Sequence, residues 1–247
     1  MPLPNIFKPK NNYSLIRIGR LYDGGYLLTE HSLKKTKALI SFGIFDDCSF
    51  EFDFTKRKDV NSYCYDKSLV KSFWKKKLFN DLAASIYNLN FLFFIKSLTR
   101  YYEHILFFKN NKNKLFIQKI DNGSVAKILN ELNYLDSFFF KIDIEGSEYR
   151  ILDELIKYQN SICGLVIEFH DLDLHLEKVV NFINNFNLTI THVHANNFGG
   201  VDINNNPRVI ELTFEKNPLV VGGDLLIPNL LDQKNDPTTP DISLEFI

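Results

Sequence analysis

Residues 138–152 have the sequence FFFKIDIEGSEYRIL, an apolar run that ends abruptly in charged side chains. Four of these side chains follow within a few positions: Lys141, Asp143, Glu145 and Glu148. Placing such groups beside a buried apolar strand is costly unless each is paired or faces a site. The segment therefore predicts a buried strand whose end delivers polar side chains to a functional site.

Apolar runs typical of strands alternate with helical patterns on both sides of this segment. We expect strands at residues 38–43, 60–65, 114–120, 137–143, 162–168, 188–193 and 208–214. Between most of them, apolar residues repeat at the spacing of one helix face, as in Val125, Ile128, Leu129 and Leu132. This alternation predicts a mainly parallel sheet with right-handed helical crossovers.

The last two expected strands are joined by the turn-rich stretch NNFGGVDINNNP, which has no helical pattern. Such a connection predicts an antiparallel hairpin, because parallel neighbours need a longer crossover. We therefore predict an α/β Rossmann-like fold whose seven-stranded, mostly parallel sheet has helices on both faces and an antiparallel last hairpin. This is the class I fold of S-adenosylmethionine (SAM) methyltransferases rather than the nicotinamide-binding Rossmann fold.

The length of 247 residues suits a single domain with additions at three places. We expect an N-terminal leader rich in turns at 1–30, a helical insertion at 68–109 and an irregular tail at 216–247. The most apolar stretch, 91–108, is interrupted by charges at helical spacing, which predicts an amphipathic helix and no membrane span. The insertion could form part of a substrate pocket or a homodimer surface, and the sequence leaves both open.

Net charge, cysteine spacing and the N-terminal segment limit the partners and the location that the sequence predicts. The formal net charge is −1, so no global field attracts nucleic acid or an anionic membrane. The three cysteines have no CxxC spacing, and the first residues have no apolar segment long enough for a signal peptide. We expect a soluble cytoplasmic protein that acts on a small molecule.

The ends of the first two strands are candidates for cofactor contacts, because ligands of such sheets lie beyond the carboxyl ends of the strands. Gly43 lets backbone approach a ligand, and Asp66 follows at nearly the spacing expected of a carboxylate on a ribose diol. The alternative for Asp66 is a helix cap. Asp121 and Asn122, after the third strand, are candidates for contacts with adenine.

The loop after the first strand, FGIFDDCSFE, lacks the GxGxxG pattern of dinucleotide-binding proteins. Its Asp46 and Asp47 are poor neighbours for a diphosphate but tolerable beside the sulfonium and amino groups of SAM. Glu51 could likewise meet the amino group. The alternative interpretation is that these are solvated loop acids.

Residues 141–148, KIDIEGSE, resemble the FkbM-type SAM-dependent methyltransferases, whose fourth strand ends in KID-x-EG-x-E. The resemblance implies a class I fold, SAM as methyl donor and O-methylation, often of sugars or polyketide hydroxyls. Of that family's usual first loop, DVGAN-x-G, the chain keeps only Gly43. The turn at residues 23–26 in the leader, with Asp23, Gly24 and Tyr26, could compensate by folding over the methionine carboxylate, or could be an ordinary turn.

Two later strands end in the sequences EFHDLD and THVHANN, which bring histidines to the same rim. Methyl transfer to a hydroxyl needs a base to take the proton, and histidine suits that role near neutral pH. We predict His194 or His170 as this base, with Asp143 orienting it or the substrate hydroxyl. Candidate substrate-binding residues are Glu145, Glu168, His192, Asn196 and Asn197.

A metal site is an alternative interpretation of the same rim. Asp143, Glu168 and His170 could bind Mg²⁺ or Mn²⁺, which would polarise a vicinal diol. We do not predict a metal ion as a required cofactor.

Together these features predict a SAM-dependent O-methyltransferase. The expected acceptor is a hydroxyl of a sugar or nucleotide-activated sugar used in surface or capsule polysaccharide biosynthesis. Two alternatives remain: a nicotinamide-dependent sugar oxidoreductase or epimerase, for which GxGxxG and a YxxxK pair are missing, and a non-catalytic binding protein on a methyltransferase fold.

Overall fold

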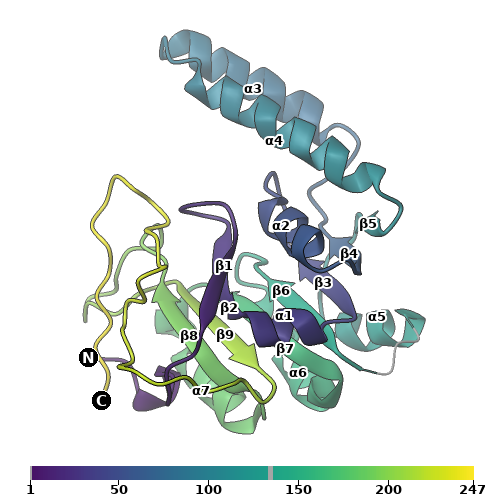
Figure 1. Ribbon diagram of the computed structural model, residues 1–247. Helices are drawn as coiled ribbons and strands as arrows, with labels where there is room; N and C mark the ends of the chain where they lie inside the picture. The colour runs from purple at the N-terminus through teal and green to yellow at the C-terminus, as the bar shows by residue number, and fades with distance from the viewer. Residues whose placement is uncertain (1, 133–135) are drawn as a thin grey trace.

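The computed structural model describes residues 2–132 and 136–247, and its largest element is a mixed β-sheet (Figure 1). The strand order in these residues is β5–β4–β3–β6–β7–β9–β8. The strands are β3 (Ala38–Phe42), β4 (Asn61–Tyr65), β5 (Asn113–Phe116), β6 (Phe138–Ile142), β7 (Ile162–Phe169), β8 (Thr189–Ala195) and β9 (Ile210–Glu215). Strands β3 to β7 pair in parallel, and β9 runs antiparallel to both β7 and β8.

The predicted fold class is confirmed. Within the described residues the sheet is seven-stranded, mostly parallel and closed by the expected antiparallel pair, the Rossmann-like arrangement of class I methyltransferases. The chain moves outward from β3 to β5 and then returns to β6 on the other side of β3, which creates a switch point between β3 and β6. The third strand ends at Phe116, earlier than expected, because a turn begins where Gln118 N donates to Phe116 O.

Alternating side chains of the sheet supply two apolar cores, one on each face. Ile40 and Phe140 point into the core covered by α5 (Ser124–Leu132), α6 (Leu152–Tyr158) and α7 (Leu172–Asn185). Leu39 and Phe139 point into the core covered by α1 (Glu30–Lys35), α2 (Ser49–Arg57) and the leader. Helices therefore lie on both faces, as predicted (Figure 1).

The leader is more regular than the sequence suggested. Besides a short turn of 3-10 helix, η1 (Asn5–Phe7), it forms an antiparallel pair of strands, β1 (Leu15–Gly19) and β2 (Gly25–Thr29). All of β2 is buried, and the carboxylate of Glu215 at the end of β9 accepts a hydrogen bond from Thr29 N (2.6 Å). The sequence did not predict these two short strands, which are stabilised by packing against the sheet.

The insertion forms two antiparallel helices, α3 (Phe73–Tyr87) and α4 (Leu92–Lys109), which extend away from the sheet (Figure 1). We call residues 68–109 the helical arm. Its base is attached to the loop after β3, where Asp46 pairs with Lys77 (3.0 Å) and Arg100 (2.6 Å). No helix in the described ranges is long and apolar enough to cross a membrane.

The tail after β9 contains no helix or strand among its described residues and runs back over the molecule. Leu3 and Phe246 form a β-bridge, which brings the two ends of the chain side by side (Figure 1). A second bridge joins Tyr13 to Val220. The tail therefore covers the β8 edge of the sheet and the start of the leader.

Candidate functional site

A cavity of about 350 Å³ opens beyond the carboxyl ends of β3, β4 and β6, at the switch point of the sheet. Its walls include Gly43, Tyr65, Asp66, Ile120, Asp143 and Glu145. Its volume lies within the range of about 300–1,000 Å³ usual for small-molecule sites. The structure thus brings together four of the predicted site residues in one concave place.

Gly43 is required by the backbone geometry of this cavity. Its φ of +78° lies in the left-handed region that favours glycine. A Cβ added here would lie 1.6 Å from the backbone oxygen of Asp143. The loops after β3 and β6 therefore approach each other at a distance that no other residue permits.

Asp66 lies at the cavity, but its carboxylate is engaged by the protein itself. One oxygen accepts hydrogen bonds from the backbone N–H groups of Ile44 (3.0 Å) and Phe45 (2.7 Å). The other accepts from the backbone N–H (2.7 Å) and the hydroxyl (2.6 Å) of Ser68. A carboxylate has about four acceptor positions, so a ribose diol would have to replace some of these bonds. The geometry makes Asp66 first of all the anchor of the loop after β3.

The residues predicted to contact adenine lie beside the cavity rather than in its wall. The carboxylate of Asp121 accepts from Lys119 (2.8 Å) and Arg150 (3.0 Å). The hydrogen bond from Lys119 helps to lower the pKa of Asp121 to about 2. Asn122 is exposed, whereas Gln118 belongs to the cavity wall. The cavity wall is thus formed by residues 118–120, just before the two residues predicted to contact adenine.

The acids of the loop after β3 serve the protein interior and the helical arm. Glu51 is completely buried, accepts a hydrogen bond from the hydroxyl of Ser41, and has a pKa raised by burial. It cannot meet the amino group of a ligand in the cavity as predicted. Asp47 pairs with Arg20 (2.9 Å) and Arg100 (3.2 Å). The sequence predicts these acids either beside SAM or in solvent, and does not predict the ion pairs of Asp47 with the leader and the helical arm.

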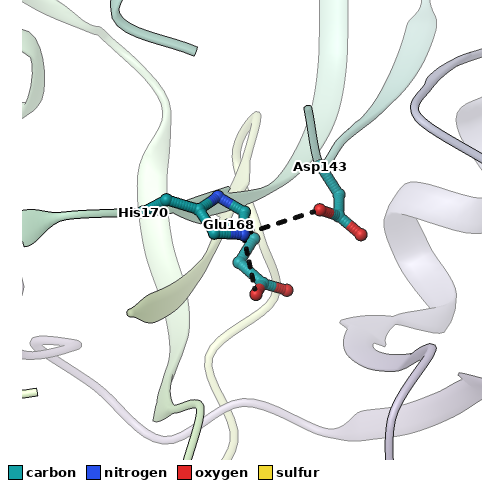
Figure 2. A group of neighbouring side chains, drawn as sticks. All are labelled: Asp143, Glu168 and His170. Atoms are coloured by element: carbon teal, nitrogen blue, oxygen red, sulfur yellow. Dashed lines mark ion pairs between the residues drawn. The ribbon is translucent and has the colours of Figure 1, made fainter. Parts of the chain in front are cut away.

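Asp143, Glu168 and His170 converge beside the cavity, and we call them the acid–imidazole cluster (Figure 2). They come from the ends of β6 and β7, which are neighbours in the sheet. His170 Nε2 lies 3.5 Å from Glu168 Oε1 and 3.9 Å from Asp143 Oδ1. The exposed Glu145, whose carboxylate lies 3.5 Å from the same nitrogen, completes the rim.

Glu148 fixes the orientation of His170. Its fully buried carboxylate lies 2.9 Å from His170 Nδ1 and accepts from Ile144 N (3.1 Å). Burial opposes a charge on the imidazole, but the bond to Glu148 and the surrounding carboxylates together outweigh burial, and the pKa of His170 is raised. Nδ1 is thereby occupied and Nε2 faces the cluster. The sequence showed Glu148 as part of the charged motif but gave it no role.

Tyr26 reaches the acid–imidazole cluster from the leader. Its hydroxyl lies 3.2 Å from Glu168 Oε2 and 3.4 Å from Asp143 Oδ2. Asn196 donates to Glu168 Oε1 (2.9 Å), and the ammonium of Lys141 lies 3.3 Å from Asp143 Oδ2. Burial and the neighbouring Asp143 raise the pKa of Glu168. Donors therefore surround both carboxylates of the cluster.

The rest of the leader turn does not line the cavity. Arg17 donates to the carbonyls of Arg20 (3.0 Å) and Tyr22 (2.5 Å), and so closes its own hairpin. Asp23 lies 3.5 Å from the side chain of Asn235 in the tail. The adjoining Gly24 faces the Asp47 side chain. In this structure residues 20–24 form the turn of the β1–β2 hairpin, and only Tyr26, on β2, extends to the site.

The tail covers three of the predicted substrate and catalytic residues. His192 Nε2 lies 2.8 Å from Asp232. Asn197 donates to the Asp236 carbonyl (2.8 Å) and receives a bond from its N–H. His194 is buried between Glu211 (3.5 Å) and the tail residue Asp241 (3.7 Å). These contacts hold the tail, which the sequence could not place.

His194 lies outside the acid–imidazole cluster. In the sheet register Glu168 is opposite Glu211, and Glu211 is opposite His194, which puts two strand spacings, about 10 Å, between them. Burial disfavours its charge, but the hydrogen bond to Glu211 and the nearby carboxylates of Glu211, Asp232 and Asp241 together outweigh burial and raise the pKa of His194 to about 9. His194 is therefore an imidazolium at neutral pH and cannot take a proton. Of the two predicted bases, the geometry retains His170.

This raised pKa predicts an alkaline loss of stability. Because the folded-state pKa exceeds the unfolded value, the contribution of His194 is complete below pH 6.5 and lost as pH rises through about 9. We expect it to be about 1–3 kcal/mol. Urea unfolding at pH 7 and pH 10 measures this contribution as the difference in free energy of unfolding between the wild type and His194→Gln. An equal difference at both pH values would contradict the assignment.

No family model matches this sequence, and no curated protein matches it significantly. Similar solved structures include Precorrin-6y C5,15-methyltransferase from Geobacter metallireducens GS-15, with 11% identity, 76% of this chain and 87% of that chain covered, and a TM-score of 0.40. The fibrillarin/Nop5p complex gives 10% identity, 74% and 73% coverage and a TM-score of 0.41. TYW2 of M. jannaschii in complex with AdoMet gives 10% identity, 76% and 75% coverage and 0.37. Similarity at this level says nothing about the ligand or reaction of this chain.

Proposed function

We propose that this chain is a SAM-dependent O-methyltransferase of the FkbM type. Its proposed acceptor is a hydroxyl of a sugar or nucleotide-activated sugar. The observation that carries the proposal is the position of Asp143, which both lines the cavity at the switch point and belongs to the acid–imidazole cluster. A cofactor site and a proton-accepting site therefore share one wall.

The cavity fits the adenosyl group of SAM. Gly43 allows close approach of backbone, Tyr65 and Ile120 offer apolar contact, and the Gln118 amide can both donate and accept hydrogen bonds. Bound SAM would supply an electrophilic methyl group on a sulfonium.

His170 is the proposed general base. Glu148 holds Nδ1, so Nε2 is left to accept the proton of an acceptor hydroxyl. The imidazolium that forms is stabilised by the Glu148 carboxylate behind it, as in other acid–histidine pairs. Glu168 and the exposed Glu145 lie around the same nitrogen and are suited to bind neighbouring sugar hydroxyls.

The same three groups could hold a divalent ion, since their ligand atoms lie within 4.8 Å of one another. Their surroundings favour the metal-free role. The Lys141 ammonium already neutralises Asp143, while Tyr26 and Asn196 occupy both oxygens of Glu168. We expect turnover to persist in EDTA. Activity that disappears in EDTA and returns with Mg²⁺ or Mn²⁺ would replace the base by a metal site.

Ligand binding separates the proposal from its two alternatives. A ligand at 100 times its dissociation constant stabilises a protein by about 2.7 kcal/mol, which is visible as a raised unfolding temperature. We expect stabilisation by SAM and S-adenosylhomocysteine but not by NAD. Stabilisation by NAD alone would favour the oxidoreductase. If SAM binds but no nucleotide sugar in a pool is methylated, the proposed acceptor is wrong. If SAM binds but no hydroxyl acceptor of any kind is methylated, the chain is better described as a binding protein.

A further inference from the structure

The connection between α3 and α4 ends the helical arm in apolar surface. No Asp, Glu, Lys, Arg or His occurs from residue 82 to residue 95. The large exposed side chains of this fully described stretch are Ile86, Tyr87, Leu89, Phe91, Leu92, Phe93 and Ile95. Leu89 and Tyr87 are 87% and 88% exposed. We call residues 86–95 the apolar tip.

Several polar groups of this turn are hydrogen-bonded within it. Asn90 accepts from Leu92 N (3.1 Å), and its own N–H donates to Ser85 O (3.0 Å). The buried hydroxyl of Ser85 accepts from Phe94 N (3.2 Å), and the Asn88 amide donates to a carbonyl of α3 (2.9 Å). A turn that bonds its own backbone can leave water at low cost, which an apolar lipid environment demands.

The charge of the helical arm differs in sign from that of the rest of the chain. Residues 68–109 contain seven basic and two acidic side chains, a net charge of +5. Since the whole chain carries −1, the remainder carries −6. The exposed basic residues of the arm are Lys71, Lys75, Lys76, Lys96 and Lys109. The nearly neutral total therefore conceals a basic arm on an acidic body.

The dimensions of the arm suit shallow insertion into a bilayer. Arg100 fixes α4 to Asp46, and Leu92 lies eight residues nearer the tip, about 12 Å at the rise of an α-helix. Lys96 lies about 6 Å from Leu92 by the same measure. Apolar faces of interfacial helices are buried about 5–10 Å deep, with lysines at the level of the headgroups.

We propose that the apolar tip inserts into the surface of an anionic phospholipid bilayer, with Lys96 at the level of the lipid phosphates and the other exposed lysines of the arm attracting the anionic surface from further away. An exposed apolar surface of this extent marks an interaction site. A second copy joined arm to arm is a less suitable partner for the tip, because two arms of charge +5 repel each other. Docking of the tip on the acidic body of a second copy is the dimer outcome that the test below separates. An anionic bilayer complements both the apolar surface of the tip and the positive charge of the arm. The proposal is independent of the proposed methyl transfer.

Vesicle sedimentation of the full chain tests this inference. The vesicles contain phosphatidylcholine alone or equal parts of phosphatidylcholine and phosphatidylglycerol. We expect binding to the anionic vesicles, weakened several-fold at 1 M salt because the Debye length falls to about 3 Å. The double variant Leu89→Asp/Leu92→Asp should bind the anionic vesicles at least about 10-fold more weakly than the wild type. Both positions are exposed, so the fold should be unchanged, which the unfolding temperature checks.

The matched control is Leu174→Asp/Ile203→Asp, which changes two equally exposed apolar residues outside the arm. It should bind vesicles like the wild type. The proposal is overturned if wild type ignores anionic vesicles, or if the tip variant binds as well as the control. It is also overturned if the wild type is a dimer in solution that does not bind vesicles, and the tip substitutions convert that dimer to a monomer.

Discussion

Replacing His170 by glutamine is expected to lower the rate of methyl transfer by about 10²–10⁴-fold, the usual contribution of a general base. The variant loses the nitrogen that lies 3.5 Å from Glu168 and beside Asp143, and its amide cannot accept a proton at neutral pH. SAM binding should be unchanged, because His170 is not part of the cavity wall. Single-turnover rates with saturating SAM give the measurement, and calorimetry gives the binding constant.

The pH dependence of the same reaction tests the partner of this histidine. Because the pKa of His170 is raised, the neutral base should form only above pH 6.5, and the rate should rise with pH through that raised value. Glu148→Gln removes the negative charge behind Nδ1, so the rise should move to lower pH. His31→Gln, on α1, is the matched control and should leave rate and profile unchanged. An unchanged rate in His170→Gln would remove the base assignment.

The fold could be predicted because its signals are local. Apolar runs bounded by glycine or charge marked the strands, and a helical period marked α5, whose Val125 and Ile128 are buried as expected. The missing helix before β9 predicted the antiparallel edge. The leader strands carried no comparable signal. They are short, and what makes β2 a strand is burial against distant residues such as Thr213, whose hydroxyl donates to Leu27 O (2.7 Å).

The site was predicted in part for the same reason. Residues that end parallel strands must share one edge of the sheet, so Gly43, Asp143 and Glu168 could be brought together from the sequence. What each side chain contacts depends on segments that no strand pattern locates. His194 pairs with Asp241 of the tail, and Asp46 pairs with Arg100 of the helical arm. Both segments attach through ion pairs and hydrogen bonds between residues far apart in the chain, which leave no periodic trace in the sequence.

Gly43 lies at the junction between the proposed cofactor cavity and the acid–imidazole cluster. Gly43→Ala is expected to destabilise the fold by about 2–5 kcal/mol and to abolish SAM binding. The left-handed backbone costs an L-residue about 1–2 kcal/mol, and overpacking a rigid contact adds about 1–3 kcal/mol. The contact is rigid because the new Cβ would lie 1.6 Å from a backbone oxygen, that of Asp143. Urea unfolding and calorimetric titration with SAM measure the two effects.

Gly123→Ala separates the steric contact from the backbone conformation. Its φ of +82° nearly equals the +78° of Gly43, but a Cβ there has no atom within 4 Å. It should cost only the conformational share, about 1–2 kcal/mol, and leave SAM binding intact. Equal effects of the two substitutions would mean that the loops after β3 and β6 can separate, and that their close approach does not shape the cavity. A larger loss of stability for Gly43→Ala than for Gly123→Ala, together with loss of SAM binding in Gly43→Ala alone, would tie that approach directly to cofactor binding.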